Sequence, residues 1–208
     1  MKKILMTTAL SLAATASQAA TLGFNLTISN LLDTNNSLTN VPLMTLVNTS
    51  DTALLQQFTL TIGNTAYNYD ALYSFEPTPD GTMTLTQGDM DDFNTGGNLQ
   101  RVDVGVIDFT SFDPGETAKW RVDVDLDNAD TVENYRTVLF NNGDGPNSEF
   151  SALFSDGTVL SIVADDQTAS NTSFTFSASQ TTPVPVPAAL PLLLAGLGGF
   201  AVLRRRRT

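Results

Sequence analysis

The 208-residue sequence contains no histidine and no cysteine. Without histidine it cannot build a Ser-His-Asp triad, a histidine general base or most zinc sites. Without cysteine it has no disulfide, thiol nucleophile or thiolate metal ligand. A glycine-rich phosphate loop is also missing, since the closest candidate, Gly96-Gly97, lacks the required spacing and lysine. Among the residues that remain, the 22 Asp and Glu residues allow a pair of catalytic carboxylates or a calcium site.

Basic residues are few and unevenly placed. Six of the ten lie in the terminal segments, at Lys2, Lys3 and residues 204–207. The remaining four stand against all 22 acidic residues, which gives the body of the chain a net charge of −18. Such a body repels phosphates and anionic lipid and attracts divalent cations. We therefore exclude nucleic acid as a partner.

The first residues have the order of a secretory signal peptide. Two lysines precede an apolar run from Ile4 to about Ala16. Ser17-Gln18-Ala19 follows it, with small side chains at the two positions that a signal peptidase reads. The run is too uniformly apolar for a half-exposed amphipathic helix. We expect a signal peptide at residues 1–19, cleaved after Ala19, and hence an exported protein.

The last residues combine three features in a fixed order. A stiff, extended segment comes first, because each proline restricts its own backbone and that of the residue before it; this segment reads Val184, Pro185, Val186, Pro187, Ala188. Residues 188–203 are apolar, Gly or Pro, and as a helix they cover about 24 Å; counted from 184 the run just spans a bilayer core of roughly 30 Å. The cluster of positive charge behind it stays on the cytoplasmic side; it consists of Arg204, Arg205, Arg206 and Arg207. The segment predicts a transmembrane helix with the body outside.

This tail of about 25 residues resembles the PEP-CTERM class of bacterial protein-sorting signals. The similarity is closest to the variant whose motif reads Val-Pro-Leu-Pro-Ala, with Val186 at the leucine position, where the parent class has glutamate. The resemblance implies recognition by a membrane-embedded exosortase, which cleaves near the motif in Gram-negative bacteria that produce exopolysaccharide. It also implies transient anchoring in the inner membrane, followed by transfer to the cell surface or release outside the cell.

Between these segments, residues 20–182 alternate apolar and polar side chains in short runs broken by Asn, Asp, Gly and Pro, the pattern of half-buried strands. We predict strands at residues 22–29, 42–48, 53–62, 82–86, 100–109, 117–127, 135–141, 149–154, 158–164 and 172–178. One helical turn is allowed between Asp130 and Arg136, where Asp130 and Glu133 can form a capping pair. The pattern predicts a single all-β domain at residues 20–182, an antiparallel, jelly-roll-like β-sandwich, with the sorting signal at 183–208.

The stretch around "DPGE" at residues 113–116 predicts a hairpin between strands 100–109 and 117–127. In the second strand Trp120, Val122 and Val124 share one face, with Lys, Arg and Asp on the other. The first strand changes its apolar phase after Val106, which predicts a bulge at or beside Gly105 and places Phe109 opposite Trp120. The stretch from "FDPGE" to "FSALFSDGTVLS" is also similar to a pattern in the bodies of other exported proteins with such tails, which implies a fold and not an activity.

Acidic residues form two candidate cation sites. Asp123, Asp125 and Asp127 match the first ligand positions of a calcium-binding EF-hand loop, but Asn128 and Asn134 replace its glycine and bidentate glutamate. In a strand, alternate aspartates lie about 6.5–7 Å apart, too far to share one ion without a bend. A calcium site, a solvated acidic face and a polar surface for a partner all remain open. The second candidate is the loop with Asp89, Asp91 and Asp92; no cofactor other than calcium is expected.

Three functional hypotheses follow. The leading one is a non-enzymatic protein of the cell surface or extracellular matrix, associated with exopolysaccharide. The second is a calcium-assisted carbohydrate-binding module, with Tyr67, Tyr69 and Tyr73 as a platform. The third is a glycoside hydrolase with two carboxylates, one of them buried and raised in pKa. Asn-x-Ser/Thr triplets at Asn25, Asn35, Asn48 and Asn171 are interpreted as ordinary strand and turn residues, with glycosylation as the alternative.

Overall fold

The computed structural model describes residues 19–29, 42–73, 83–87, 103–126, 135–140, 146–165 and 173–181. The body is one compact unit, Thr21–Thr181. The predicted signal peptide, apart from Ala19, and the whole predicted sorting signal lie outside the described residues.

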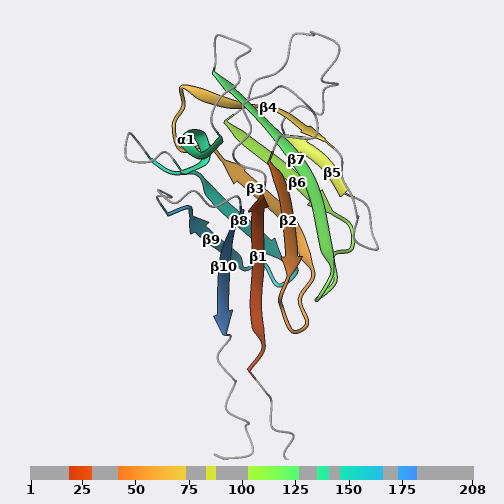
Figure 1. The fold of residues 1–208 in the computed structure, drawn as a ribbon. Coiled ribbons are helices and arrows are strands. Elements are labelled where there is room, and N and C mark those ends of the chain that lie inside the picture. Colours follow the sequence, from red (N-terminus) through yellow and green to blue (C-terminus); the bar gives the residue numbers. More distant parts are fainter. Residues whose placement is uncertain are drawn as a thin grey trace, which may run out of the picture. The chain divides into compact units, whose positions relative to one another are not determined.

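The described residues form two five-stranded antiparallel sheets and one short helix (Figure 1). Sheet A has the order β10-β1-β2-β7-β4, and sheet B has the order β5-β6-β3-β8-β9. The elements are β1 (Thr21–Ser29), β2 (Leu43–Asn48), β3 (Leu55–Thr61), β4 (Tyr67–Tyr73), β5 (Met83–Gln87), β6 (Val104–Phe109), β7 (Thr117–Leu126), α1 (Tyr135–Phe140), β8 (Glu149–Phe154), β9 (Val159–Val163) and β10 (Ser173–Thr181). The predicted all-β content is confirmed, and the arrangement is consistent with a β-sandwich.

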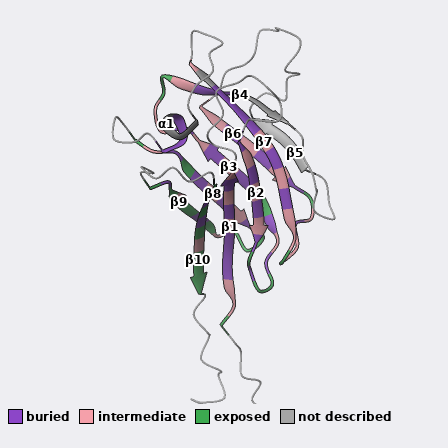
Figure 2. Ribbon diagram, viewed as in Figure 1, coloured by how far each residue is buried: buried purple, intermediate pink, exposed green. Residues whose placement is uncertain are grey.

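Alternating side chains form the core between the sheets. In β1 the apolar residues Phe24, Leu26 and Ile28 are buried, while the polar residues between them are partly exposed (Figure 2). The ring of Phe24 in sheet A lies 5.5 Å from that of Phe58 in sheet B, which lies 5.8 Å from that of Trp120 in sheet A. The buried residues of both sheets belong to one hydrophobic cluster. Truncating such a buried aromatic side chain typically costs about 3–5 kcal/mol, so these rings are a main source of stability.

The predicted hairpin around residues 113–116 is wrong, although the turn itself is present. Gly115 has a φ of 86°, and the Glu116 amide donates to the Asp113 carbonyl oxygen at 3.1 Å. The turn, however, joins β6 of sheet B to β7 of sheet A. Phe109 therefore has no strand pairing with Trp120, and its ring packs against Phe112 at 4.8 Å. An apolar alternation looks the same in a hairpin and in a strand pair split between two sheets.

The predicted bulge at Gly105 is also wrong. β6 pairs with β3 in unbroken register from Val104 to Asp108. Gly105 faces the core together with Ile107 and Phe109, while the valines lie on the outer face. The irregularity of this region is on the neighbouring strand, between Leu85 and Gln87 of β5.

One predicted strand is a helix, and one strand was not predicted. Residues 135–140 form α1, in which three consecutive side chains, Val138, Leu139 and Phe140, are all buried, as a strand facing solvent on one side would not allow. The unpredicted strand is β4, which pairs with β7 and is irregular between Tyr69 and Ala71. The other nine predicted strands match observed ones, with shifts of a few residues at their ends.

Candidate functional site

The two ends of the body lie side by side. β1 pairs with β10 along its whole length (Figure 1). The register places Thr21 directly opposite Thr181. Ala19, the predicted last residue of the signal peptide, is exposed just before β1. The sorting-motif residues Val184, Pro185, Val186, Pro187 and Ala188 and the arginines Arg204, Arg205, Arg206 and Arg207 lie outside the described residues. The chain thus enters and leaves the body at the same end of sheet A.

The loop after β2 holds the beginning of β1. The Thr21 amide donates to the Asp51 carboxylate at 2.6 Å, and the Asp51 amide donates to the Thr21 carbonyl oxygen at 2.9 Å. The Thr49 amide donates to the Gly23 carbonyl oxygen at 2.9 Å, and the Gly23 amide donates to the Ser50 hydroxyl at 3.1 Å. A Cβ on Gly23 would lie 2.7 Å from the Thr49 hydroxyl oxygen and 3.0 Å from the Ala178 carbonyl oxygen, so glycine permits this close approach. We call this set of contacts the terminal junction.

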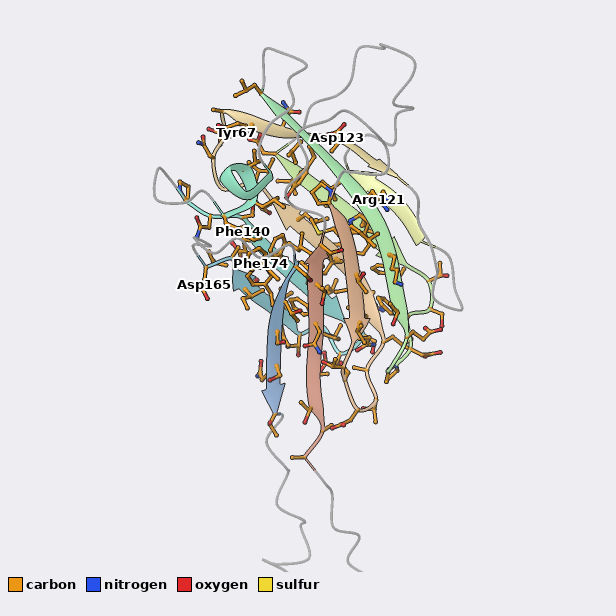
Figure 3. The ribbon with its side chains drawn as sticks, in the orientation of Figure 1. Tyr67, Arg121, Asp123, Phe140, Asp165 and Phe174 are labelled. Carbon is orange, nitrogen blue, oxygen red and sulfur yellow. The ribbon has the colours of Figure 1, made fainter. Side chains whose placement is uncertain are left out.

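The Asp123, Asp125 and Asp127 candidate is only partly described. Asp123 lies on β7 (Figure 3) and is 6% exposed, so a solvated acidic face is wrong at this position. Its Oδ1 accepts a hydrogen bond from the Val124 amide at 3.1 Å, and its register partner is Ala71, beside the irregularity of β4. Asp125 belongs to β7, but its side chain and all of Asp127 lie outside the described part.

No group of three or more potential metal-ligating side chains occurs among the described residues. The second candidate loop, with Asp89, Asp91 and Asp92, falls in the undescribed stretch 88–102. Calcium binding therefore stays a prediction for both acidic segments.

The tyrosine platform is contradicted at its centre. Tyr69 is 0% exposed and belongs to the core, and Tyr67 is partly buried and packs against that core. The side chain of Tyr73 is not described. A sugar-binding platform requires rings that are open to solvent, and Tyr69 cannot provide one.

Asn48 forms a buried polar junction that no sequence pattern predicts. Its Nδ2 donates to the carbonyl oxygens of Ala53 at 2.9 Å and Phe112 at 2.8 Å, and its Oδ1 accepts from the Ser50 amide at 3.0 Å. Its main chain also bonds to the turn before β7, with Gly115 at 2.7 Å. Asn48 is 0% exposed. We call this the Asn48 junction; its burial and bonding leave no room for glycosylation.

Three other buried polar side chains differ from Asn48 because they make no hydrogen bond among the described residues. The Tyr69 hydroxyl, the Ser148 hydroxyl and the Trp120 indole nitrogen are buried without a hydrogen-bond partner among the described residues. Burial raises the pKa of Tyr69 well above its ordinary value near 10, and the nearby Ser148 hydroxyl opposes part of that shift without reaching hydrogen-bond geometry. We call these three side chains the orphan polar set. The sequence around Tyr69 contains no signal that distinguishes a buried ring from an exposed one.

The fold and these sites define an acidic, all-β body whose chain ends emerge together. No helix within the described residues has the length and apolar character needed to cross a membrane. Comparison with known proteins finds no matching family model, no matching curated protein and no matching solved structure.

Proposed function

We propose that the chain is an exported protein that an exosortase-type enzyme sorts to the cell surface or extracellular matrix. Residues 1–19 act as a signal peptide, and the C-terminal helix anchors the protein in the inner membrane until it is processed. The body, residues 20–182, then acts by binding or by structural presence in the exopolysaccharide layer, without catalysis. Its chain crosses repeatedly between the sheets, as in a jelly-roll-like sandwich, at the β2–β3, β3–β4, β4–β5, β6–β7, β7–β8 and β9–β10 connections.

The observation that supports this proposal most is the pairing of Thr21 with Thr181. Removal of a leader after Ala19 leaves the terminal junction intact, because its hydrogen bonds begin at Thr21. Cleavage near residues 184–188 likewise falls beyond the last paired residue of β10. Both processing steps thus spare the fold of the body.

The proposal is tested by expressing the full chain in an exopolysaccharide-producing bacterium with and without its exosortase. We expect mass spectrometry to find an N-terminus at Ala20 in both strains and a C-terminus near residues 184–188 only when the enzyme is present. Replacing both prolines of the motif (Pro185→Ala with Pro187→Ala) should abolish this cut, whereas Pro191→Ala, outside the motif, should retain it. Identical C-termini in the two strains would refute the sorting proposal.

Calcium-assisted carbohydrate binding is the alternative for the body, and the buried Tyr69 weakens it. A calcium site would add RT ln(1 + [L]/Kd), about 2.7 kcal/mol at a hundredfold excess over Kd, and would raise the unfolding midpoint by several degrees. Under our proposal, calcium and magnesium shift the midpoint equally. A shift with calcium alone, which disappears in Asp125→Asn, would favour the alternative.

The two-carboxylate hydrolase needs a second acid beside a buried one, about 5–10 Å away. Among the described acids only Asp123 is buried, and it accepts a main-chain hydrogen bond. We propose a structural role for it. Release of reducing sugar from exopolysaccharide by the wild type, lost in Asp123→Asn, would contradict that assignment.

A further inference from the structure

The last strand of the body has two unlike halves. In the first half Phe174 and Phe176 are buried, and their rings lie 5.1 Å and 5.7 Å from that of Phe140 in α1; Figure 3 shows Phe140 beside Phe174. Phe176 also lies 5.7 Å from the ring of Phe150 in sheet B. In the second half Ala178 is partly buried, and the three residues after it are all exposed. Main-chain pairing with β1 is what keeps those three residues in the sheet.

The exposed end of β10 is next to the predicted sorting motif. Only residues 182 and 183 separate Thr181 from Val184, and six residues separate it from the apolar run that begins at 188. Fully extended, those six residues reach at most about 20 Å. A membrane-embedded enzyme would therefore have to bind the motif with the folded body close against it.

The beginning of β1 has hydrogen bonds that do not involve this end of β10. Thr21 and Gly23 direct their main-chain hydrogen bonds to the loop at residues 49–51, away from β10. The terminal junction thus holds the beginning of β1 when its neighbour leaves. Release of three exposed residues is the kind of local opening that costs little compared with unfolding of the domain.

We propose that Ser179, Gln180 and Thr181 form a detachable spacer, a role that rests on the proposed sorting function. In the free protein they complete sheet A by pairing with Gly23, Leu22 and Thr21. When the processing enzyme binds the motif, they peel away and lengthen the free segment by about 10 Å. Separation of β10 from β1 cannot extend past Phe176, because the ring of Phe176 is held between α1 and sheet B.

The test locks the spacer with a disulfide in the full-length chain, which has no cysteine of its own. Thr21→Cys with Thr181→Cys joins directly opposed residues at the end of the spacer. The Cα atoms of such a pair lie within the range that a disulfide spans. The matched control is Thr27→Cys with Thr175→Cys, an opposed pair in the anchored half whose hydroxyl oxygens lie 2.9 Å apart. Both variants are made in the exosortase-containing strain, and the cleaved fraction is measured by mass spectrometry with and without reductant.

We expect the oxidised spacer lock to be cleaved at least tenfold more slowly than wild type and to recover on reduction, while the control is cleaved at the wild-type rate. A third variant keeps the lock and inserts six Gly and Ser residues between Thr181 and Thr182; it should be cleaved at close to the wild-type rate. Wild-type cleavage of the locked spacer would overturn the spacer proposal, as would an inserted segment that fails to restore cleavage. Failure of the wild type itself to be cleaved would instead refute the sorting function.

Discussion

The Asn48 junction and the orphan polar set are both buried in one core, but they differ in how their polar atoms are bonded. Asn48 uses both side-chain atoms and ties two loops to the end of β2. The three members of the orphan polar set bury a hydroxyl or an indole nitrogen with no described partner. A buried polar group costs little when it is bonded and about 1–3 kcal/mol when it is not. The same change, removal of a polar atom, should therefore have opposite effects in the two places.

The largest effect is expected at Asn48. Asn48→Ala leaves the Ala53 carbonyl oxygen and the Ser50 amide without a partner among the described residues and removes one of two bonds to the Phe112 carbonyl oxygen, which the Leu55 amide also reaches. The free energy of unfolding should therefore fall by about 4 kcal/mol. Urea unfolding of residues 20–182 measures it. Asn25→Ala, on the outer part of β1, is the control and should change the value by less than about 0.5 kcal/mol. Equal losses in the two variants would remove the special role of the junction.

The second-largest loss of stability is expected for Gly63→Ala, which introduces a steric clash with the main chain at Pro146, two residues before Ser148. A Cβ on Gly63 would clash with the carbonyl oxygen of Pro146, which is main chain and cannot move aside easily. We expect Gly63→Ala to lower the free energy of unfolding by about 3 kcal/mol. Gly115→Ala is the matched case without a clash, because its Cβ meets nothing within 4 Å and only its φ of 86° is unfavourable; about 1 kcal/mol is expected there. A smaller loss at residue 63 than at residue 115 would contradict this packing.

The pH dependence of stability should single out Tyr69. Its pKa is raised by burial, so the folded protein keeps the proton that the unfolded chain releases above about pH 10. The stabilisation is complete below pH 10 and is lost as pH rises, by up to about 1.4 kcal/mol per pH unit. Denaturant unfolding between pH 9 and pH 11 should show this slope in the wild type and a shallower one in Tyr69→Phe. Parallel slopes would mean that Tyr69 titrates normally.

The smallest effect, and one of opposite sign to that at Asn48, is expected at Ser148. Its main-chain groups bond to Leu139 and Ala164, so Ser148→Ala removes only the orphan hydroxyl. The free energy of unfolding should rise by up to about 1 kcal/mol. Ser151→Ala, on the outer side of β8, should change it by less than about 0.5 kcal/mol. A loss of more than 1 kcal/mol at residue 148 would show that its hydroxyl is bonded to Tyr69.

The strands were predictable because their alternation is a local property of the sequence. Nine of the ten predicted strands lie where expected, since one side of each faces the core and the other faces solvent. The grouping of strands into sheets was not predictable in this way. β6 and β7 have the pattern of a hairpin, yet they belong to different sheets, because every core-facing strand in both layers has that pattern. Helix α1 was missed for a related reason, since its buried run is short enough to read as a strand.

The candidate sites were less accessible to sequence reasoning than the strands. Asn48 lies in a chance-like Asn-x-Ser triplet, and its role depends on carbonyl oxygens 5 and 64 residues away. Asp123, Asp125 and Asp127 occupy alternate positions, a pattern that favours an acidic face open to solvent. The burial of Asp123 depends instead on tertiary contacts of β7 that the pattern does not contain. Tyr69 differs from an exposed platform residue only in the face of the sheet to which its side chain points, and that face is the core. Each of these properties arises from contacts between distant segments.

The pairing of the first strand with the last also sets a condition on folding. The hydroxyls of Thr27 and Thr175 meet although 148 residues separate them in the chain. Contacts of such long sequence separation form slowly, because a large loop must close before they give any stability. If the chain is exported as proposed, β1 emerges first and can pair with β2 soon afterwards, but its other edge waits for β10 until almost the whole sequence has followed. The topology therefore favours a chain that stays unfolded enough to pass through the membrane. Sheet A is completed only when β10 has emerged.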